Sequence, residues 1–327
     1  MKLNRRTLLA AAATATAGSI CIPYIARAQT HKMAVGYFVG NSIYWDLIVA
    51  EKKGLFSNNG LEPTFTNLQS SPQGIQLAVS GSLDLVAVQP EPMVAAFEQG
   101  GTNLGILTAP MNMADWTLNV QPEIKNLGDL RGKVIGVSAL QNSECWQTEQ
   151  MLAGAGVGPG EFDFLVVGTS PSKIIALQQK SIAATILFQP SGELAVQEGY
   201  PSLIKYSALR QYPPIVYTAR REWAATGAGK MASNALRKAH DWLYDPTNRE
   251  EAVALLAGVT NRDPALLDRI YDMYFVTDPI YSKTGAVSGA GLNAALVDMV
   301  EKGDFMQDSK PDPEKYLIPE SEGGLRE

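Results

Sequence analysis

The chain has 327 residues, of which 46% are apolar and 18% charged, and its formal net charge is −6. This apolar content is typical of a packed globular protein and excludes a disordered, collagen-like or coiled-coil chain. The length predicts roughly two domains or one large one. Only two histidines and two cysteines are present, which leaves little material for a metal site or a nucleophilic triad.

The first 28 residues are typical of an export signal. A basic start with Arg5 and Arg6 precedes an apolar run, and a small-x-small sequence ends at Ala28. The run is too short to span a membrane, which takes about 20 apolar residues. Residues 4–9 resemble the twin-arginine export motif, and an ordinary secretory signal with two adjacent arginines is the alternative.

We expect cleavage near Ala28, because Ile20 occupies the position before Cys21 where a lipidation signal has a small residue. The segment contains four cations and no acid, so the mature chain has 23 basic and 33 acidic residues and a net charge of about −10. Such a charge disfavours binding to nucleic acid or to an anionic membrane. Cys145 is then the one remaining cysteine, which allows no internal disulfide.

The mature sequence alternates short β-rich runs with helical patterns. Strands are predicted over 32–38, 61–68, 83–88 and 104–108, with helices over 44–53 and 71–79. Alternation of this kind indicates a mainly parallel sheet that is flanked by helices.

The same pattern then restarts after a turn at 127–133. Strands are predicted over 134–137, 164–167, 183–188 and 203–206, with helices over 143–154 and 171–180. This repetition predicts a second lobe with the architecture of the first.

The last third of the chain is mostly helical. One strand is predicted over 215–218, followed by helices over 230–244, 249–257, 264–274 and 289–302. His240 falls in the first of these helices, where we expect it at the surface. From Ser309 the sequence is polar and rich in Pro and Gly, which predicts a loosely held tail.

Four segments, in order, resemble periplasmic solute-binding proteins of the nitrate, sulfonate, taurine and thiamine-precursor type. Residues 50–63 read AEKKGLFSNNGLEP and are similar to that family's "EKGLFEKEGLDV" segment. Residues 76–84, 127–136 and 176–184 resemble its "ALLSGEAD", "LKDLKGKKIG" and "ALQSGQVDA" segments. Each match alone is weak, but four in order with matching spacing cover nearly all of the mature chain.

The resemblance implies an α/β fold of two lobes that close on a ligand by a hinge motion. Lobe I would combine residues 29–116 with 210–327, and lobe II would hold residues 117–209. The resemblance also implies a monomer without a cofactor, which passes a small molecule to an ABC permease and its ATPase subunit.

Open α/β sheets bind ligands beyond the carboxyl ends of their strands, which directs attention to the loops that follow strands. Those loops contain hydroxyl and amide side chains at predicted helix starts, several aromatic side chains and two acids. The candidate ligand-binding residues are Tyr37, Asn41, Ser42, Tyr44, Ser70, Ser71, Gln89, Glu91, Asn112, Asn142, Ser143, Glu144, Thr169, Gln189 and Tyr212.

Each candidate also has a structural interpretation. Ser and Asn are common helix caps, and an acid at a helix start is stabilised by the helix dipole. Trp45 and Trp146 are each expected in the core. The loops contain no Lys or Arg, although they contain Glu91 and Glu144, so the charge of the ligand stays open.

The predicted function is a binding protein of an ABC importer for a sulfonate, nitrate or taurine-like compound, a pyrimidine or an aromatic acid. An enzyme on the same fold, such as a thiamine-pyrimidine synthase or a menaquinone-pathway lyase, is the alternative. A periplasmic receptor that signals ligand occupancy is a third possibility. The scarcity of His and Cys favours a protein that leaves its ligand unchanged.

Overall fold

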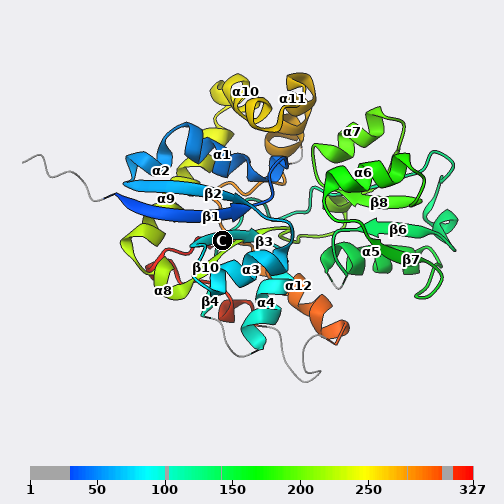
Figure 1. Ribbon diagram of the computed structural model, residues 1–327, viewed down its shortest axis with the longest axis horizontal. Coiled ribbons are helices and arrows are strands. Elements are labelled where there is room, and N and C mark those ends of the chain that lie inside the picture. Colours follow the sequence, from blue (N-terminus) through cyan, green and yellow to red (C-terminus); the bar gives the residue numbers. More distant parts are fainter. Residues whose placement is uncertain (1–29, 100–102, 141, 278, 304–311, 327) are drawn as a thin grey trace, which may run out of the picture.

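The computed structural model describes residues 30–99, 103–140, 142–277, 279–303 and 312–326. The predicted export signal, 1–28, therefore lies outside the described residues. The described chain forms two lobes that lie side by side in Figure 1, and each is built around one five-stranded sheet. No helix within these ranges combines the length and apolarity that a bilayer crossing requires.

The sheet of lobe I has the strand order β2-β1-β3-β10-β4. Its strands are β1 (His31–Tyr37), β2 (Leu61–Asn67), β3 (Leu85–Val88), β4 (Leu104–Thr108) and β10 (Val216–Arg220). β1 pairs in parallel with β2 and β3, whereas β10 runs antiparallel to both of its neighbours. β3 and β4 are buried throughout, in keeping with their mostly apolar sequences, LVAV and LGILT.

The sheet of lobe II has the matching order β7-β6-β8-β5-β9. Its strands are β5 (Thr117–Val120), β6 (Val134–Val137), β7 (Asp163–Val166), β8 (Ala184–Leu187) and β9 (Ser202–Lys205). β5 runs antiparallel in the place that β10 occupies in lobe I. The sequence pattern did not predict β5, because its two polar residues interrupt the apolar run.

Each of these antiparallel strands comes directly after a chain crossing between the lobes. The first crossing joins β4 to β5, and the second joins β9 to β10. The exact lobe boundaries, at about 116 and 210, stay a prediction.

Helices cover both sheets, as Figure 1 shows. They are α1 (Trp45–Lys52), α2 (Leu55–Asn58), α3 (Ser71–Val79), α4 (Pro90–Glu98), α5 (Ser143–Gly154), α6 (Ser170–Gln178), α7 (Ser191–Gln197), α8 (Arg221–Ala224), α9 (Gly227–Tyr244), α10 (Arg249–Thr260), α11 (Pro264–Asp272) and α12 (Gly289–Glu301). The bounds predicted for α5 are confirmed. The start of α4, Pro-Glu-Pro, reads as a loop in the sequence, yet proline is tolerated in the first helical turn because its N–H is not needed there.

The core of the described chain contains two large apolar clusters and two small ones, the small ones in lobe II. One fills the α1 and α9 side of lobe I and contains Trp45. The other runs from lobe I through Trp116, on the first crossing, to Trp146 in lobe II. The predicted core positions of Trp45 and Trp146 are therefore confirmed.

The prediction that His240 lies at the surface is wrong, because its side chain is fully buried. His240 shares one face of α9 with Leu236 and Leu243, as the three- and four-residue spacing of a helix requires. Its Nε2 lies 3.1 Å from Asp46 Oδ2, and its Nδ1 lies 2.6 Å from the carbonyl oxygen of Ser282.

The prediction of a loosely held tail is also wrong for the part that is described, residues 312–326. The backbone N–H of Ile106 donates to Tyr316 O, and that of Ile318 donates to Ile106 O. Ile318 is fully buried. The tail therefore lies along the β4 edge of lobe I. Three buried apolar residues in an otherwise mostly polar segment, Tyr316, Leu317 and Ile318, hold it there.

Candidate functional site

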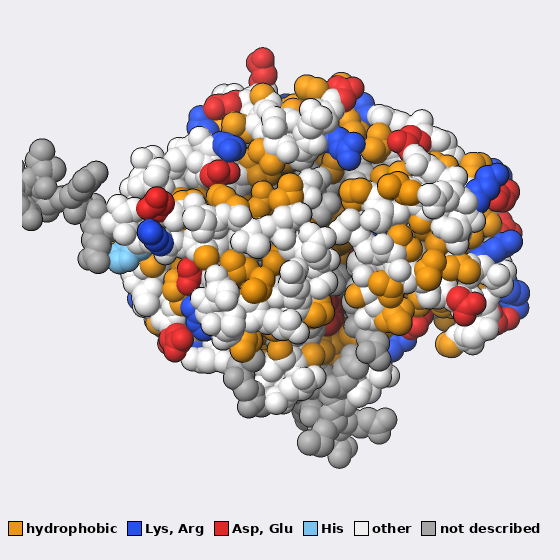
Figure 2. All heavy atoms as spheres, viewed as in Figure 1, with side chains coloured by type: hydrophobic (Ala, Val, Ile, Leu, Met, Phe, Trp, Pro, Cys, Tyr) orange, Lys and Arg blue, Asp and Glu red, His pale blue; other side chains and the backbone are white. Residues whose placement is uncertain are grey.

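A cavity of about 510 Å³ lies between the two lobes. Figure 2 shows that the surface is hollowed along their boundary. The lining comes from loops that follow β1, β2 and β3 in lobe I and β6 and β7 in lobe II. The cavity therefore occupies the place that the strand-end rule predicts for a ligand.

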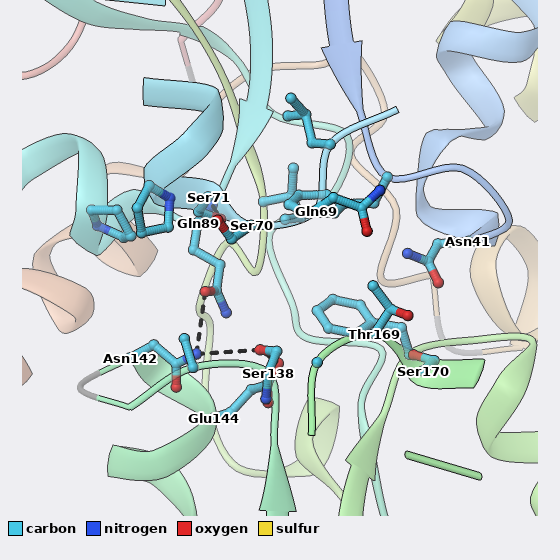
Figure 3. Close-up of a pocket in the computed structure, with 18 of the residues that line it drawn as sticks. Asn41, Gln69, Ser70, Ser71, Gln89, Ser138, Asn142, Glu144, Thr169 and Ser170 are labelled. Atoms are coloured by element: carbon cyan, nitrogen blue, oxygen red, sulfur yellow. Dashed lines mark hydrogen bonds between the residues drawn. The ribbon is translucent and has the colours of Figure 1, made fainter. Parts of the chain in front are cut away.

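Polar side chains of the two lobes face each other across this space, as Figure 3 shows. Lobe I contributes Asn41, Gln69, Ser70, Ser71 and Gln89, and lobe II contributes Ser138, Asn142, Glu144, Thr169 and Ser170. The lining also has apolar surface, including the aromatic rings of Phe38, Tyr44 and Phe188. A mixed lining of this kind suits a small organic molecule.

Helices α3, α4, α5 and α6 all begin at the cavity wall. A helix N-terminus has unpaired N–H groups and a partial positive charge. Ser70 accepts a hydrogen bond from Gln73 N, and Asn142 accepts one from Cys145 N, so both cap their helices. Asn41 and Thr169 make no such side-chain cap. The capping interpretation therefore applies to only part of the predicted set.

Gln89 connects the two lobes across the cavity. Its Oε1 accepts a hydrogen bond from Asn142 Nδ2 at 3.4 Å, which Figure 3 marks, and its Nε2 donates to Ser143 Oγ at 3.4 Å. Its backbone N–H donates to Ser71 Oγ at 3.1 Å. Both bonds across the cavity are long, so a ligand can replace them at small cost.

Glu144, in the first turn of α5, is buried and neutralised by a lysine. Lys173 Nζ donates to Glu144 Oε2 at 2.9 Å and to Ile186 O at 3.0 Å, and each side chain is 1% exposed. Ser138 also donates to Glu144, from its backbone N–H and from its hydroxyl. Glu144 is therefore satisfied without a ligand.

Sequence reasoning missed Lys173, because it lies one turn inside α6 and not in a strand-end loop. The available signal was its spacing from Leu177, which places both on the buried face of this helix.

Glu91, in the first turn of α4, is also buried, but no lysine or arginine within the described ranges forms an ion pair with it. The hydroxyl of Tyr212 donates to Glu91 Oε1, whereas Glu91 Oε2 is shielded from solvent and has no hydrogen-bond partner among the residues that the structure describes. Burial raises the pKa of Glu91 to about 8.

A third buried acid, Asp115, lies on the first crossing and was not among the predicted residues. Its Oδ2 accepts hydrogen bonds from Gln189 N and from the hydroxyl of Tyr274, which lies 2.9 Å from Ser42 Oγ. Burial raises the pKa of Asp115 to about 6. Asp115 thus joins residues of both lobes beside the crossing.

Nine of the fifteen predicted residues line the cavity, namely Asn41, Tyr44, Ser70, Ser71, Gln89, Glu91, Asn142, Glu144 and Thr169. Four of the other six lie behind it and support it. Tyr37 packs edge-on against Tyr44, Ser143 bonds Gln89, Tyr212 bonds Glu91, and Ser42 N donates to Gln189 O.

Gln189 itself precedes a cis proline, and Asn112 bonds Ala286 O and Ser288 N away from the lining. Contact of any of the fifteen with a ligand stays a prediction. Within the described ranges, no group of three or more His, Cys, Asp or Glu side chains could hold a metal ion.

A model of the NMT1-like family matches residues 26–257. A presumed binding protein of Brucella abortus (strain 2308) is 25% identical over 280 residues, which cover 81% of this chain and 82% of that protein.

Solved structures share the fold. The alkanesulfonate-binding protein SsuA from Xanthomonas axonopodis pv. citri, bound to MOPS, has a TM-score of 0.70 at 19% identity and covers 90% of this chain and 98% of its own. The periplasmic nitrate-binding protein NrtA from Synechocystis PCC 6803 has a TM-score of 0.74 at 14% identity and covers 86% and 83%. The desulfurization enzyme DSZB has a TM-score of 0.65 at 13% identity and covers 89% and 97%. The predicted two-lobed α/β fold and the family resemblance are confirmed.

Proposed function

The chain belongs to the NMT1-like family, and we propose that it is the extracytoplasmic solute-binding protein of an ABC importer. In this role it captures a small organic nutrient between its lobes and delivers it to a membrane permease. The observation that carries the proposal is the cavity of about 510 Å³ whose walls come from both lobes.

The two crossings supply the hinge in this proposal. Lobe I, residues 29–116 and 210–327, and lobe II, residues 117–209, would rotate about them to admit and enclose the ligand. Closure would form the contacts that Gln89 makes with Asn142 and Ser143 and would exclude water from the bound molecule. The closed form would then be the one that the permease recognises.

The partners in this proposal are the small-molecule ligand, the permease and its ATPase subunit. The protein would act as a monomer in the periplasm, after export through a twin-arginine signal that is cleaved near Ala28. Nucleic acid is not a partner in this proposal, because the mature chain is acidic.

The proposal also holds that the ligand leaves chemically unchanged, although the fold serves an enzyme in DSZB. The described lining contains neither His nor Cys, and its Lys173 is bonded to Glu144. A general base or nucleophile of the usual kinds would have to come from outside this lining.

Ligand titration of the purified mature protein tests the proposal. The panel contains alkanesulfonates, nitrate, taurine, pyrimidines and aromatic acids, and the readouts are melting temperature and tryptophan fluorescence. Trp116 packs edge-on against Phe188 of the lining, so its emission should respond to a bound molecule. A binder must raise the melting temperature, because it stabilises the folded state. Turnover of a panel compound by the protein alone would contradict the proposal.

A further inference from the structure

The polar side chains that line the cavity fall into two groups. In the first group, Gln89, Ser138, Asn142 and Glu144 bond one another, and Lys173 completes their network. These side chains have partners before a ligand arrives. A ligand that bound them would replace existing hydrogen bonds and would gain only the difference, so the first group contributes little to affinity.

The second group, Asn41, Thr169 and Ser170, has no such network. None of these three side chains makes a hydrogen bond to any residue within the described ranges. Asn41 belongs to lobe I and the other two to lobe II, and Figure 3 shows Asn41 facing them, away from the network around Asn142. A ligand group that lies here gains hydrogen bonds without breaking any between protein groups.

Ser170 is the most informative member of the second group, because it is buried. The residue is 7% exposed and belongs to the cavity lining. Unlike Glu91 Oε2, the hydroxyl oxygen of Ser170 is not sealed from solvent, so the space that it faces is the cavity. A buried side chain with an unpaired polar group is uncommon in proteins. The cavity is where a partner for this hydroxyl can bind.

Ser170 is also the first residue of α6, whose N-terminus differs from the other three at the cavity. The side chains of Ser70 and Asn142 cap α3 and α5, and Pro90 and Pro92 remove two N–H groups from the start of α4. α6 has no side-chain cap, and the backbone N–H of Ser170 has no partner among the residues that the structure describes. The start of α6 therefore keeps an unpaired N–H group and its partial positive charge.

The second group is rich in hydrogen-bond donors and contains no charged side chain. The hydroxyls of Thr169 and Ser170, the amide of Asn41 and the backbone N–H of Ser170 can each donate to a ligand. A negatively charged acceptor makes stronger hydrogen bonds than a neutral one, and a helix N-terminus attracts it further. A ligand amine could only donate, so it would leave the N–H unpaired and would meet the positive end of α6. The group therefore favours an oxyanion.

We propose that Asn41, Thr169, Ser170 and the N-terminus of α6 form the subsite for an oxyanion group, a carboxylate or a sulfonate, of an organic ligand. This inference rests on the proposed function and narrows its ligand to an organic acid. The rest of the ligand lies against the aromatic rings of the lining. Because the oxyanion bonds lobe I through Asn41 and lobe II through α6, its binding favours the closed arrangement of the lobes.

The two acids of the described lining do not oppose an anionic ligand. Glu144 is paired with Lys173, which lies one turn inside α6 itself. Glu91 is buried, and burial raises its pKa to about 8, so its acid form predominates at neutral pH. Neither glutamate therefore presents an unpaired negative charge to the ligand at neutral pH.

Matched compounds on one carbon skeleton test the ligand class. The probes are benzoate, benzenesulfonate, benzamide and benzylamine, with the same four head groups on a hexyl chain, and the readouts are melting temperature and tryptophan fluorescence at neutral pH. We expect a carboxylate or a sulfonate to bind at least about tenfold more tightly than the matching amide, and the amine more weakly still. Tighter binding of an amide, an amine or a neutral pyrimidine overturns this inference but supports the proposed function. No binding by any compound counts against both.

Substitutions at the start of α6 test the subsite itself. Ser170→Ala and Thr169→Val remove one hydroxyl each with little change of shape, so each should weaken binding of the strongest acid about tenfold. The melting temperature without ligand should stay the same, because neither hydroxyl has a partner among the described residues. Ser172→Ala is the matched control, because Ser172 lies in the same helical turn but is exposed and outside the lining. Wild-type affinity in both variants, or an equal loss in the control, overturns the inference.

Asn41→Asp tests the charge of the bound group with almost no change of shape. A carboxylate at this position repels an oxyanion, whereas Asn41→Ala only removes a donor. Asn41→Asp should therefore bind the strongest acid at least about tenfold more weakly than Asn41→Ala does, and added salt should narrow this difference. Equal affinities of the two variants would show that no negative group lies beside residue 41 and overturn the inference. If Asn41→Asp does not fold, the two hydroxyl variants at the start of α6 decide it.

Discussion

The two walls of the cavity each contain a buried glutamate at the second position of a helix, yet the two acids differ in their partners. Glu91 of α4 is 2% exposed and Glu144 of α5 is fully buried. Glu144 accepts from Lys173 and twice from Ser138, whereas Glu91 accepts from the Tyr212 hydroxyl and forms no ion pair within the described residues. Residue type, helix position and burial are thus alike, and the cation partner makes the difference.

The comparison explains the electrostatics of the whole cavity. Glu144 and Lys173 form a closed ion pair that fixes the lobe II wall, and Glu91 adds no charge at neutral pH. The lining therefore has no net charge at neutral pH, although the sequence places two glutamates in it.

Removal of the cation from the lobe II wall should have the largest effect. Lys173→Met leaves Glu144 buried without a charge partner and should reduce the free energy of unfolding by about 3–5 kcal/mol. Urea denaturation at neutral pH measures this change in the free energy of unfolding. The double variant Lys173→Met with Glu144→Gln should recover much of the loss, because it leaves no unpaired charge.

The matched control for that experiment is Lys315→Met. Lys315 bonds Glu98, but its side chain is 48% exposed, so this substitution should cost less than about 1 kcal/mol. Equal losses in Lys173→Met and Lys315→Met would show that the buried pair is no more important than a surface pair.

The second-largest effect should be the contribution of Glu91 to the pH dependence of the free energy of unfolding. The pKa of Glu91 is about 8 in the folded protein against an ordinary 4.5, so between these values the folded state holds a proton that the unfolded state has released. Stability from this group is greatest below about pH 4.5 and is lost as the pH rises towards 8. Between about pH 6 and pH 9 the wild type should lose about 2–3 kcal/mol through Glu91.

Glu91→Gln isolates that loss, because its amide does not titrate. The difference in unfolding free energy between wild type and Glu91→Gln should therefore change by about 2–3 kcal/mol between about pH 6 and pH 9. A constant difference over this range would mean that Glu91 is ionised at neutral pH and that the contrast with Glu144 is wrong.

Much of the fold follows from the sequence, because strand and helix periodicities are local. The bounds of α5 and the approximate positions of the described strands other than β5 follow from apolar runs and their spacing. Short elements with mixed sequences, such as β5 and α7, depend on the sheet or lobe that they pack against, and local patterns did not predict them.

The site was predictable in place but not in detail. Nine predicted residues line the cavity, because loops after parallel strands meet at one sheet edge. The Lys173 partner of Glu144 comes from a different helix, and the Tyr212 partner of Glu91 comes from the distant second crossing. No local pattern in the sequence predicts these pairings, so the partner of each acid could be identified only from the assembled lobes.

The smallest expected effect concerns the amides of the two walls. Asn142 caps α5 through Cys145 N, so Asn142→Ala should cost about 1 kcal/mol of stability. Asn41 lines the cavity without capping a helix, so Asn41→Ala should leave stability unchanged and weaken ligand binding about 3–10-fold, through loss of one hydrogen bond. Thermal denaturation without ligand and titration of the strongest panel compound measure the two effects separately. A loss of stability in Asn41→Ala with unchanged affinity would give Asn41 a structural role only. The expected result, a stability loss in Asn142→Ala and an affinity loss in Asn41→Ala, would separate the polar residues that stabilise the cavity walls from those that bind the ligand.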